Sequence, residues 1–158
     1  MLLWCDWGKL PRIEQVDMDG KNRKVLVNSD LGWPNALSID FTANTIYWTD
    51  AKKKSIEACD LSGHNRRLVL NALSHPYGVT VLDGYLYWTD WETKSLQRAD
   101  KNTGLDRSTI RSALGNLMDV KAWKVWIDRP DAILPQISMC FLFFFLFFLI
   151  HRIGIRPG

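Results

Sequence analysis

Short runs of alternating apolar and polar residues, separated by turn-forming residues, recur along most of the chain. One unit contains four such runs, at Ala36–Asp40, Asn44–Asp50, Ser55–Leu61 and Arg66–Asn71. Runs of this kind, bounded by Gly, Asn and Asp, predict β-strands, and Asp83-Gly84 in the next unit predicts a tight hairpin turn. No amphipathic helix pattern of about 10–15 residues lies between the runs. The pattern therefore predicts an all-β fold and not a parallel α/β sheet.

The four-strand unit repeats about every 40 residues. Tyr-Trp-Thr-Asp occurs at 47–50 and 87–90, and a variant, Leu-Trp-Cys-Asp, occurs at 3–6. A Pro-led segment precedes each complete motif, as Trp33-Pro34-Asn35 and as His75-Pro76-Tyr77. Four short strands in a period of this length are typical of a β-propeller blade. We therefore predict about two whole blades and parts of two others.

These motifs resemble the YWTD β-propellers of the low-density lipoprotein receptor-related family. The match covers about Leu2–Val120 and is most similar to the branch with the Wnt co-receptors and the agrin receptor; the larger endocytic receptors are the alternative. The resemblance implies an incomplete six-bladed propeller from the ectodomain of a cell-surface receptor, at the plasma membrane or outside the cell, which binds protein ligands. Met118-Asp119 is similar to the start of the family's last propeller segment, before an EGF-like module whose six cysteines are not in this sequence.

A change of composition predicts a boundary near residue 125, between a partial propeller at 1–125 and an unrelated apolar tail at 126–158. Residues 139–150 are uninterrupted apolar side chains, but the longer stretch 132–150 contains Pro135 and Gln136 and is marginal for a membrane span. The tail has three interpretations: a membrane anchor through 132–150, a buried helix, or read-through of a pyrimidine-rich tract, which we favour. The first residues lack the pattern of a secretory signal peptide.

One rim of the propeller is the predicted ligand-binding surface. In a four-stranded meander, the start of the first strand and the end of the second lie at the same end of the blade. Exposed aromatic side chains grouped with an amide favour protein binding, and the resemblance implies that Asn35 pairs its amide with a peptide ligand. The alternative is that the aromatics pack between blades and Asn35 caps a turn. The candidate ligand-binding residues are Trp7, Trp33, Asn35, Tyr77 and Trp91, with Ala51 and Lys52 on the same rim.

Residues of the repeated motif are predicted to be structural. Large aromatics in mid-strand favour core packing, and the motif aspartates are expected to hold neighbouring backbone or turns. Cys5 and Cys59 are expected to be small core residues, whereas Cys140 lies in the tail. The structural motif set is Trp4, Asp6, Tyr47, Trp48, Asp50, Tyr87, Trp88 and Asp90.

Composition and motifs argue against other functions. With 20 Lys+Arg, 17 Asp+Glu and a net charge of +3, no strong electrostatic case for nucleic acid exists. The segment 17–20 fails the calcium-loop pattern and recurs as a turn. His64 and His75 lie in loops without a metal-binding partner motif, and Lys52–Lys54 reads as a solvated loop. We expect no metal and no cofactor.

Three functional hypotheses follow. The favoured one is a receptor segment that binds protein ligands on its rim, and not an enzyme. The second is a truncated product without independent activity, because an incomplete propeller exposes strand edges and apolar flanks that missing blades or self-association must cover. The third is a propeller hydrolase, which needs acidic and amide residues around a central metal. The candidate inner strands, Ala36–Asp40 and Gly78–Leu82, offer only one carboxylate.

Overall fold

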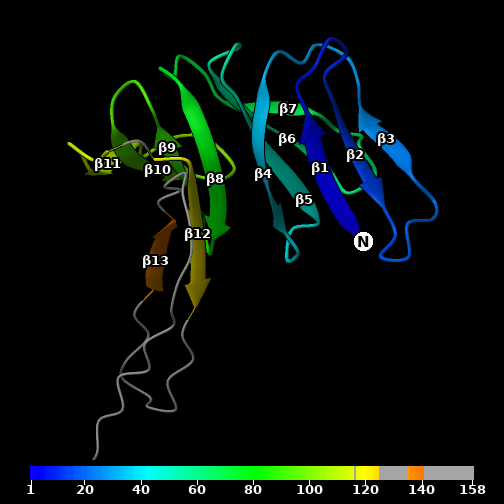
Figure 1. Ribbon diagram of the computed structural model, residues 1–158. Coiled ribbons are helices and arrows are strands. Elements are labelled where there is room, and N and C mark those ends of the chain that lie inside the picture. The colour runs from blue at the N-terminus through cyan, green and yellow to red at the C-terminus, as the bar shows by residue number, and fades with distance from the viewer. Residues whose placement is uncertain (116, 125–134, 141–158) are drawn as a thin grey trace, which may run out of the picture.

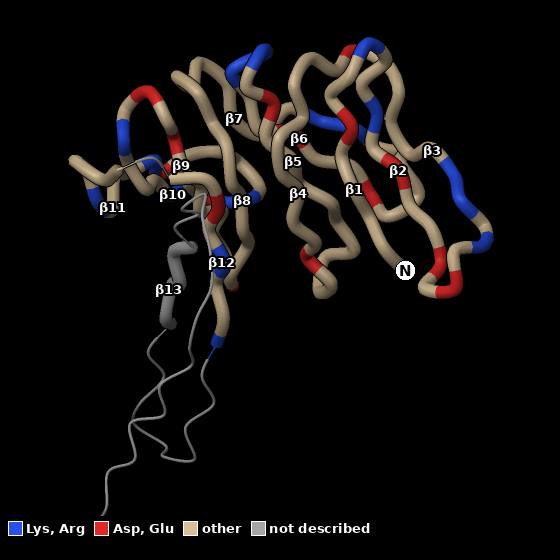
Figure 2. The backbone as a smooth tube through the Cα atoms, in the orientation of Figure 1, with Lys and Arg blue, Asp and Glu red and all other residues tan. Residues whose placement is uncertain are grey.

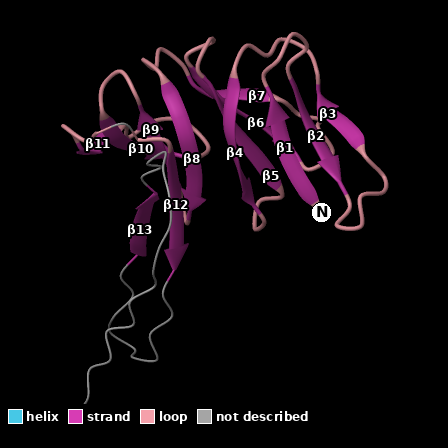
Figure 3. Cartoon of the chain, in the orientation of Figure 1, coloured by secondary structure: helices cyan, strands magenta, loops and turns pink. Residues whose placement is uncertain are grey.

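The computed structural model describes residues 1–115, 117–124 and 135–140, the last six by their backbone (Figure 1). This part of the chain contains thirteen β-strands and no helix (Figure 3). The strands are β1 (Leu2–Asp6), β2 (Arg12–Val16), β3 (Lys24–Val27), β4 (Pro34–Asp40), β5 (Thr45–Asp50), β6 (Ser55–Asp60), β7 (Arg67–Leu70), β8 (Pro76–Leu82), β9 (Tyr85–Asp90), β10 (Ser95–Asp100), β11 (Ser108–Arg111), β12 (Asp119–Lys124) and β13 (Pro135–Cys140).

The strands form four antiparallel sheets that stand side by side like the blades of a propeller (Figure 1). We number these blades in chain order: blade I is β1–β3, blade II is β4–β7, blade III is β8–β11 and blade IV is β12–β13. Within each blade, consecutive strands pair as a meander. The structure confirms the predicted all-β, partial-propeller fold.

All four strands of blade II differ slightly from the sequence prediction. The third ends at Asp60 and not at Leu61, and the fourth is Arg67–Leu70 and not Arg66–Asn71. The first strand of blade II begins at Pro34 and not at Ala36, because Pro34 still pairs with Asp50 across a bulge. The second begins at Thr45 and not at Asn44, because Asn44 has a φ of 50° and belongs to the turn. Asn tolerates this left-handed conformation better than most residues.

The core lies between the blades. Trp48 is fully buried and packs with Ile13 of blade I, whereas its neighbour Tyr47 packs with Trp88 of blade III. Successive side chains of a strand point to opposite faces, so the Tyr-Trp pair of each motif fills the two interfaces on either side of its own blade. Burial of large aromatics on both faces is what joins blade to blade.

Polar contacts at the far ends of the blades join them as well. Lys101 donates from Nζ to Asp40 Oδ2 over 2.6 Å and to the Asp83 carbonyl over 2.7 Å, which links blade III to blade II. Burial by itself raises the pKa of Asp40, but the hydrogen bonds from Lys101, Ala43 and Thr42, together with the charge of Lys101, outweigh it and lower the pKa. This pair fixes the relative positions of two blades opposite the predicted rim.

The C-terminal strand β13 belongs to the same sheet as β12. Its backbone pairs antiparallel with β12, from Asp119 opposite Cys140 to Lys124 opposite Pro135. The other residues of the predicted tail, 126–134 and 141–158, lie outside the described residues, and so does most of the candidate anchor at 132–150. Within the described residues, no helix has the length and apolar character needed to cross a membrane.

Candidate ligand-binding rim

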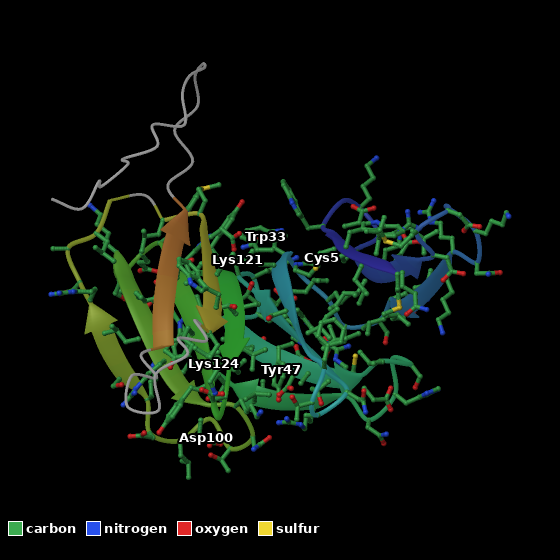
Figure 4. All side chains as sticks on the ribbon, turned by 90° about the horizontal axis from the view of Figure 1, so that it is seen from below. Cys5, Trp33, Tyr47, Asp100, Lys121 and Lys124 are labelled. Carbon is green, nitrogen blue, oxygen red and sulfur yellow. The ribbon has the colours of Figure 1, made fainter. Side chains whose placement is uncertain are left out.

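The loops that enter the first strand of each blade and the loops that follow the motif lie at one end of the blades, which we call the motif rim. It includes the loops at 28–33 and 71–75 and those at 7–11, 51–54 and 91–94. Figure 4 shows Trp33 and Cys5 toward this rim and Asp100 at the opposite side. Every candidate ligand-binding residue lies at the motif rim.

The buried motif aspartates hold the loops of this rim in place. The buried carboxylate of Asp50 accepts backbone N–H bonds from Gly32 at 2.6 Å, Trp33 at 2.9 Å and Lys53 at 3.0 Å. Asp90 repeats the arrangement one blade later, where His75 takes the place of Trp33. Each carboxylate thus holds the loop before its blade against the loop after the motif.

The motif threonines fix the first strands. Thr49 Oγ1 accepts the Ala36 N–H at 3.2 Å and donates to the Tyr77 carbonyl at 2.5 Å, so it joins blade II to blade III at a rim residue. Thr89 Oγ1 accepts the Gly78 N–H at 2.9 Å in the same position of the next blade. Blade I has Cys5 where these blades have threonine.

An aromatic pocket of about 230 Å³ opens at the motif rim. Its walls are almost entirely apolar, and three rim tryptophans stay exposed: Trp7 by 63%, Trp33 by 45% and Trp91 by 40%. Single exposed aromatics are ordinary, but aromatics gathered around a concave pocket indicate an interaction site. The pocket is lined by Trp7, Trp33, Asn35, His75 and Tyr77.

Trp91 is the fixed support beside this pocket. Its ring stacks on Tyr77 with centroids 4.9 Å apart and on His75 with centroids 5.6 Å apart. Its indole Nε1–H donates to the Leu117 carbonyl, and its backbone N–H donates to the His75 carbonyl at 3.0 Å. Stacking and hydrogen bonding hold the ring in place, so little rotamer freedom remains to be lost on binding.

Asn35 contributes the amide of the pocket. Its Nδ2 donates to the Pro76 carbonyl at 3.3 Å, across the interface between blades II and III. Among the described residues, no hydrogen bond to its Oδ1 is formed, and Asn35 lines the pocket. A primary amide used in this way can pair with the N–H and C=O of a peptide.

Two sequence expectations need revision. His75, interpreted as an ordinary loop histidine, lines the pocket; the signal was that it precedes Pro76 as Trp33 precedes Pro34. Ala51, expected on the rim surface, is 4% exposed, because its N–H donates to the Trp33 carbonyl and draws it inward.

The two cysteines with described side chains are free thiols. Burial raises the pKa of Cys5 to about 12 and that of Cys59 to about 11. Both are protonated at neutral pH, so neither has the thiolate that nucleophilic chemistry needs.

Comparison with known proteins identifies the family to which this chain belongs. Meander blades joined through Tyr-Trp-Thr-Asp motifs make the molecule a segment of a YWTD β-propeller. The family model described as low-density lipoprotein receptor repeat class B matches residues 2–41, 44–81 and 84–133. The chain therefore belongs to the family of proteins that carry low-density lipoprotein receptor class B repeats.

Several relatives of the chain are large receptors. The chain is 40% identical over 146 residues to the vitellogenin receptor of Solenopsis invicta and 45% identical over 114 residues to human low-density lipoprotein receptor-related protein 5. These matches cover 89% and 72% of this chain, but only 8% and 7% of the two receptors. The chain thus corresponds to a small part of each.

Solved structures agree with the fold. A chain of a nidogen/laminin complex matches with a TM-score of 0.67 and 29% identity, over 75% of this chain and 46% of that one. A gluconolactonase from Xanthomonas campestris matches with a TM-score of 0.58 and 19% identity, over 71% and 38%. The second likeness is one of fold alone.

Proposed function

We propose that this chain is the ligand-binding part of a low-density lipoprotein receptor-related ectodomain, and that the aromatic pocket of the motif rim binds an exposed loop of a protein ligand. The protein acts at the cell surface or outside the cell and binds protein ligands of the kind that Wnt co-receptors and lipoprotein receptors bind. The pocket lined by Trp7, Trp33, Asn35, His75 and Tyr77 carries this proposal.

Three features support a protein ligand in preference to a small molecule. The pocket is open and shallow, and its rim of exposed tryptophans offers the residue type that dominates protein interfaces. Asn35 provides a peptide-like hydrogen-bonding group inside it. The relatives also point this way, since one is named for vitellogenin and one structure is a complex of nidogen with laminin.

Trp33→Ala and Asn35→Ala should each weaken binding of loop peptides to the rim. The probe is a set of disulfide-closed peptides selected from a random library on the full chain, with dissociation constants measured by titration. Trp33→Ala removes a central aromatic anchor and should weaken binding by roughly 30-fold or more, the effect of a hot-spot residue. Asn35→Ala removes the paired amide and should weaken it by about tenfold.

Phe41→Ala is the matched control. Phe41 is an exposed aromatic, 75% accessible, in the turn between β4 and β5 on the opposite side of the same blade. Its removal should leave the affinity unchanged. Peptides that lose affinity with Phe41→Ala and keep it with Trp33→Ala would place the binding surface elsewhere and contradict the proposal.

A further inference from the structure

An arginine stacked on the motif tryptophan recurs in three blades. The guanidinium carbon lies 5.3 Å from the ring centre for Arg23 over Trp4, 5.4 Å for Arg66 over Trp48 and 5.6 Å for Arg107 over Trp88. Such cation–π contacts hold the arginine in one orientation at the outer part of its blade. The side chain that accepts hydrogen bonds from this arginine differs from blade to blade.

In blades I and II, a buried glutamate pairs with this arginine. Arg23 Nε lies 2.7 Å from Glu14 Oε2, and Arg66 Nε lies 2.7 Å from Glu57 Oε2. Blade II also receives Asp30 from the loop before it, whose carboxylate lies 2.6 Å from Lys53 Nζ. Two carboxylates and two cations therefore balance at the interface of blades I and II.

Blade III keeps the arginine and loses the carboxylates. Gln97 stands where blade II has Glu57, and its Oε1 accepts from Arg107 Nε at 3.1 Å and from Nη2 at 2.9 Å. Ala72, with a φ of 53°, stands where Asp30 has a φ of 50°, and Thr93 replaces Lys53. Among the described residues, Arg107 has no carboxylate partner, so this place carries an uncompensated positive charge.

A pocket of about 480 Å³ lies beside Arg107. The shorter side chain at position 93 leaves hydroxyl groups in the wall, and Gln97 Nε2 orders two of them by donating to Thr93 Oγ1 at 3.2 Å and Ser95 Oγ at 2.9 Å. Gln97 and Ser95 are buried, at 4% and 2% exposure, so this wall is preformed. The lining residues are Thr93, Ser95, Gln97, Arg107, Ser108, Thr109 and Ser112.

We propose that this pocket of blade III binds a tetrahedral oxyanion, a sulfate or phosphate group carried by a ligand. A fixed guanidinium with surrounding hydroxyl donors and no carboxylate matches the charge and hydrogen-bonding pattern of such a group. The equivalent places in blades I and II bind no anion, because their own glutamates occupy the arginine. The site is separate from the aromatic pocket of the motif rim and does not depend on it.

The test is a titration of the full chain with inorganic sulfate and with inorganic phosphate, at constant ionic strength held by chloride. The side-chain N–H signals of Arg107 and Gln97 are followed by NMR. Saturable shifts with either oxyanion, absent with chloride, are expected. The anion that binds more tightly assigns the source: sulfate indicates a sulfated ligand and phosphate a phosphorylated one.

Gln97→Glu restores the carboxylate of the other blades. It should pair with Arg107, leave the melting temperature unchanged or higher, and weaken oxyanion binding at least about tenfold through loss of a charge-assisted hydrogen bond. Ala72→Asp restores the second carboxylate and should act in the same direction. Arg111→Gln, which removes a positive charge from an exposed residue at the end of β11, the strand that follows Arg107, should change nothing.

Three results would overturn the oxyanion site. One is a shift that does not saturate or is equal in chloride. Another is unchanged affinity in both Gln97→Glu and Ala72→Asp. The third is an equal loss in Arg111→Gln, which would indicate a general effect of net charge.

Discussion

Replacing Gly63 by valine is expected to lower the free energy of unfolding by about 3–5 kcal/mol. Gly63 has a φ of +87°, and a Cβ placed there would lie 2.4 Å from the backbone oxygen of Leu26 in blade I. The substitution combines backbone strain with a clash against backbone that cannot move aside. Denaturant unfolding of the purified chain measures the loss.

Gly20→Val is the control for that experiment. Gly20 occupies the same turn of blade I, with a φ of +81°, but no atom lies within 4 Å of the position of its Cβ. It should cost only the strain of the conformation, about 1–2 kcal/mol. Equal losses for the two variants would show that the close approach of blade II to blade I does not exist in solution.

Replacing Asp50 by alanine is expected to lower the free energy of unfolding by about 3–5 kcal/mol and to release the loop that carries Trp33. The carboxylate is fully buried and accepts N–H bonds from Gly32, Trp33 and Lys53. Removing it leaves these three donors without the charged acceptor, and an unsatisfied buried donor costs about 1–3 kcal/mol. Chemical denaturation gives the stability, and amide hydrogen exchange of Trp33 reports on the loop.

Asp6→Ala provides the comparison in blade I. Asp6 is only partly buried and holds the Gly8 N–H at 3.0 Å, with Arg12 at 3.5 Å. Its removal should cost about 1 kcal/mol, as for a single exposed hydrogen bond. If Asp50→Ala proved as mild as Asp6→Ala, the idea that the motif aspartate organises the rim would be wrong.

The repeat in the sequence predicted the blades because the same residues create them in space. The Tyr-Trp pair stands at a fixed position of the repeat. In blade II, Tyr47 and Trp48 fill the interfaces on the two sides of their own blade. The turns were harder to predict from the sequence. The left-handed conformation of Asn44 and the bulge after Pro34 shift the strand ends by one or two residues from the predicted positions. The pairing of β13 with β12 was not predicted, because the two strands lie on different sides of the boundary that the sequence predicts near residue 125.

The position of the motif rim was predictable from the meander topology of the blades, but the exposure of its individual side chains was not. Whether a rim side chain is exposed depends on loops from the neighbouring blade, so Ala51 is buried and His75 joins the pocket. The repeat itself shows Gln97 at the position of Glu14 and Glu57, but the pocket beside Arg107 is found only in the structure. Figure 2 shows acidic and basic residues interspersed along the chain.

The most direct test of ligand binding at the motif rim is the NMR spectrum of the tryptophan indole N–H groups, recorded with and without a selected loop peptide. The chain has eight tryptophans, and the structure places Trp7, Trp33 and Trp91 at the rim and Trp48 and Trp88 in the core. Peptide binding should shift the signals of the three rim tryptophans and leave the two core signals in place. Shifts confined to other tryptophans, with Trp7, Trp33 and Trp91 unchanged at saturation, would contradict a ligand-binding rim.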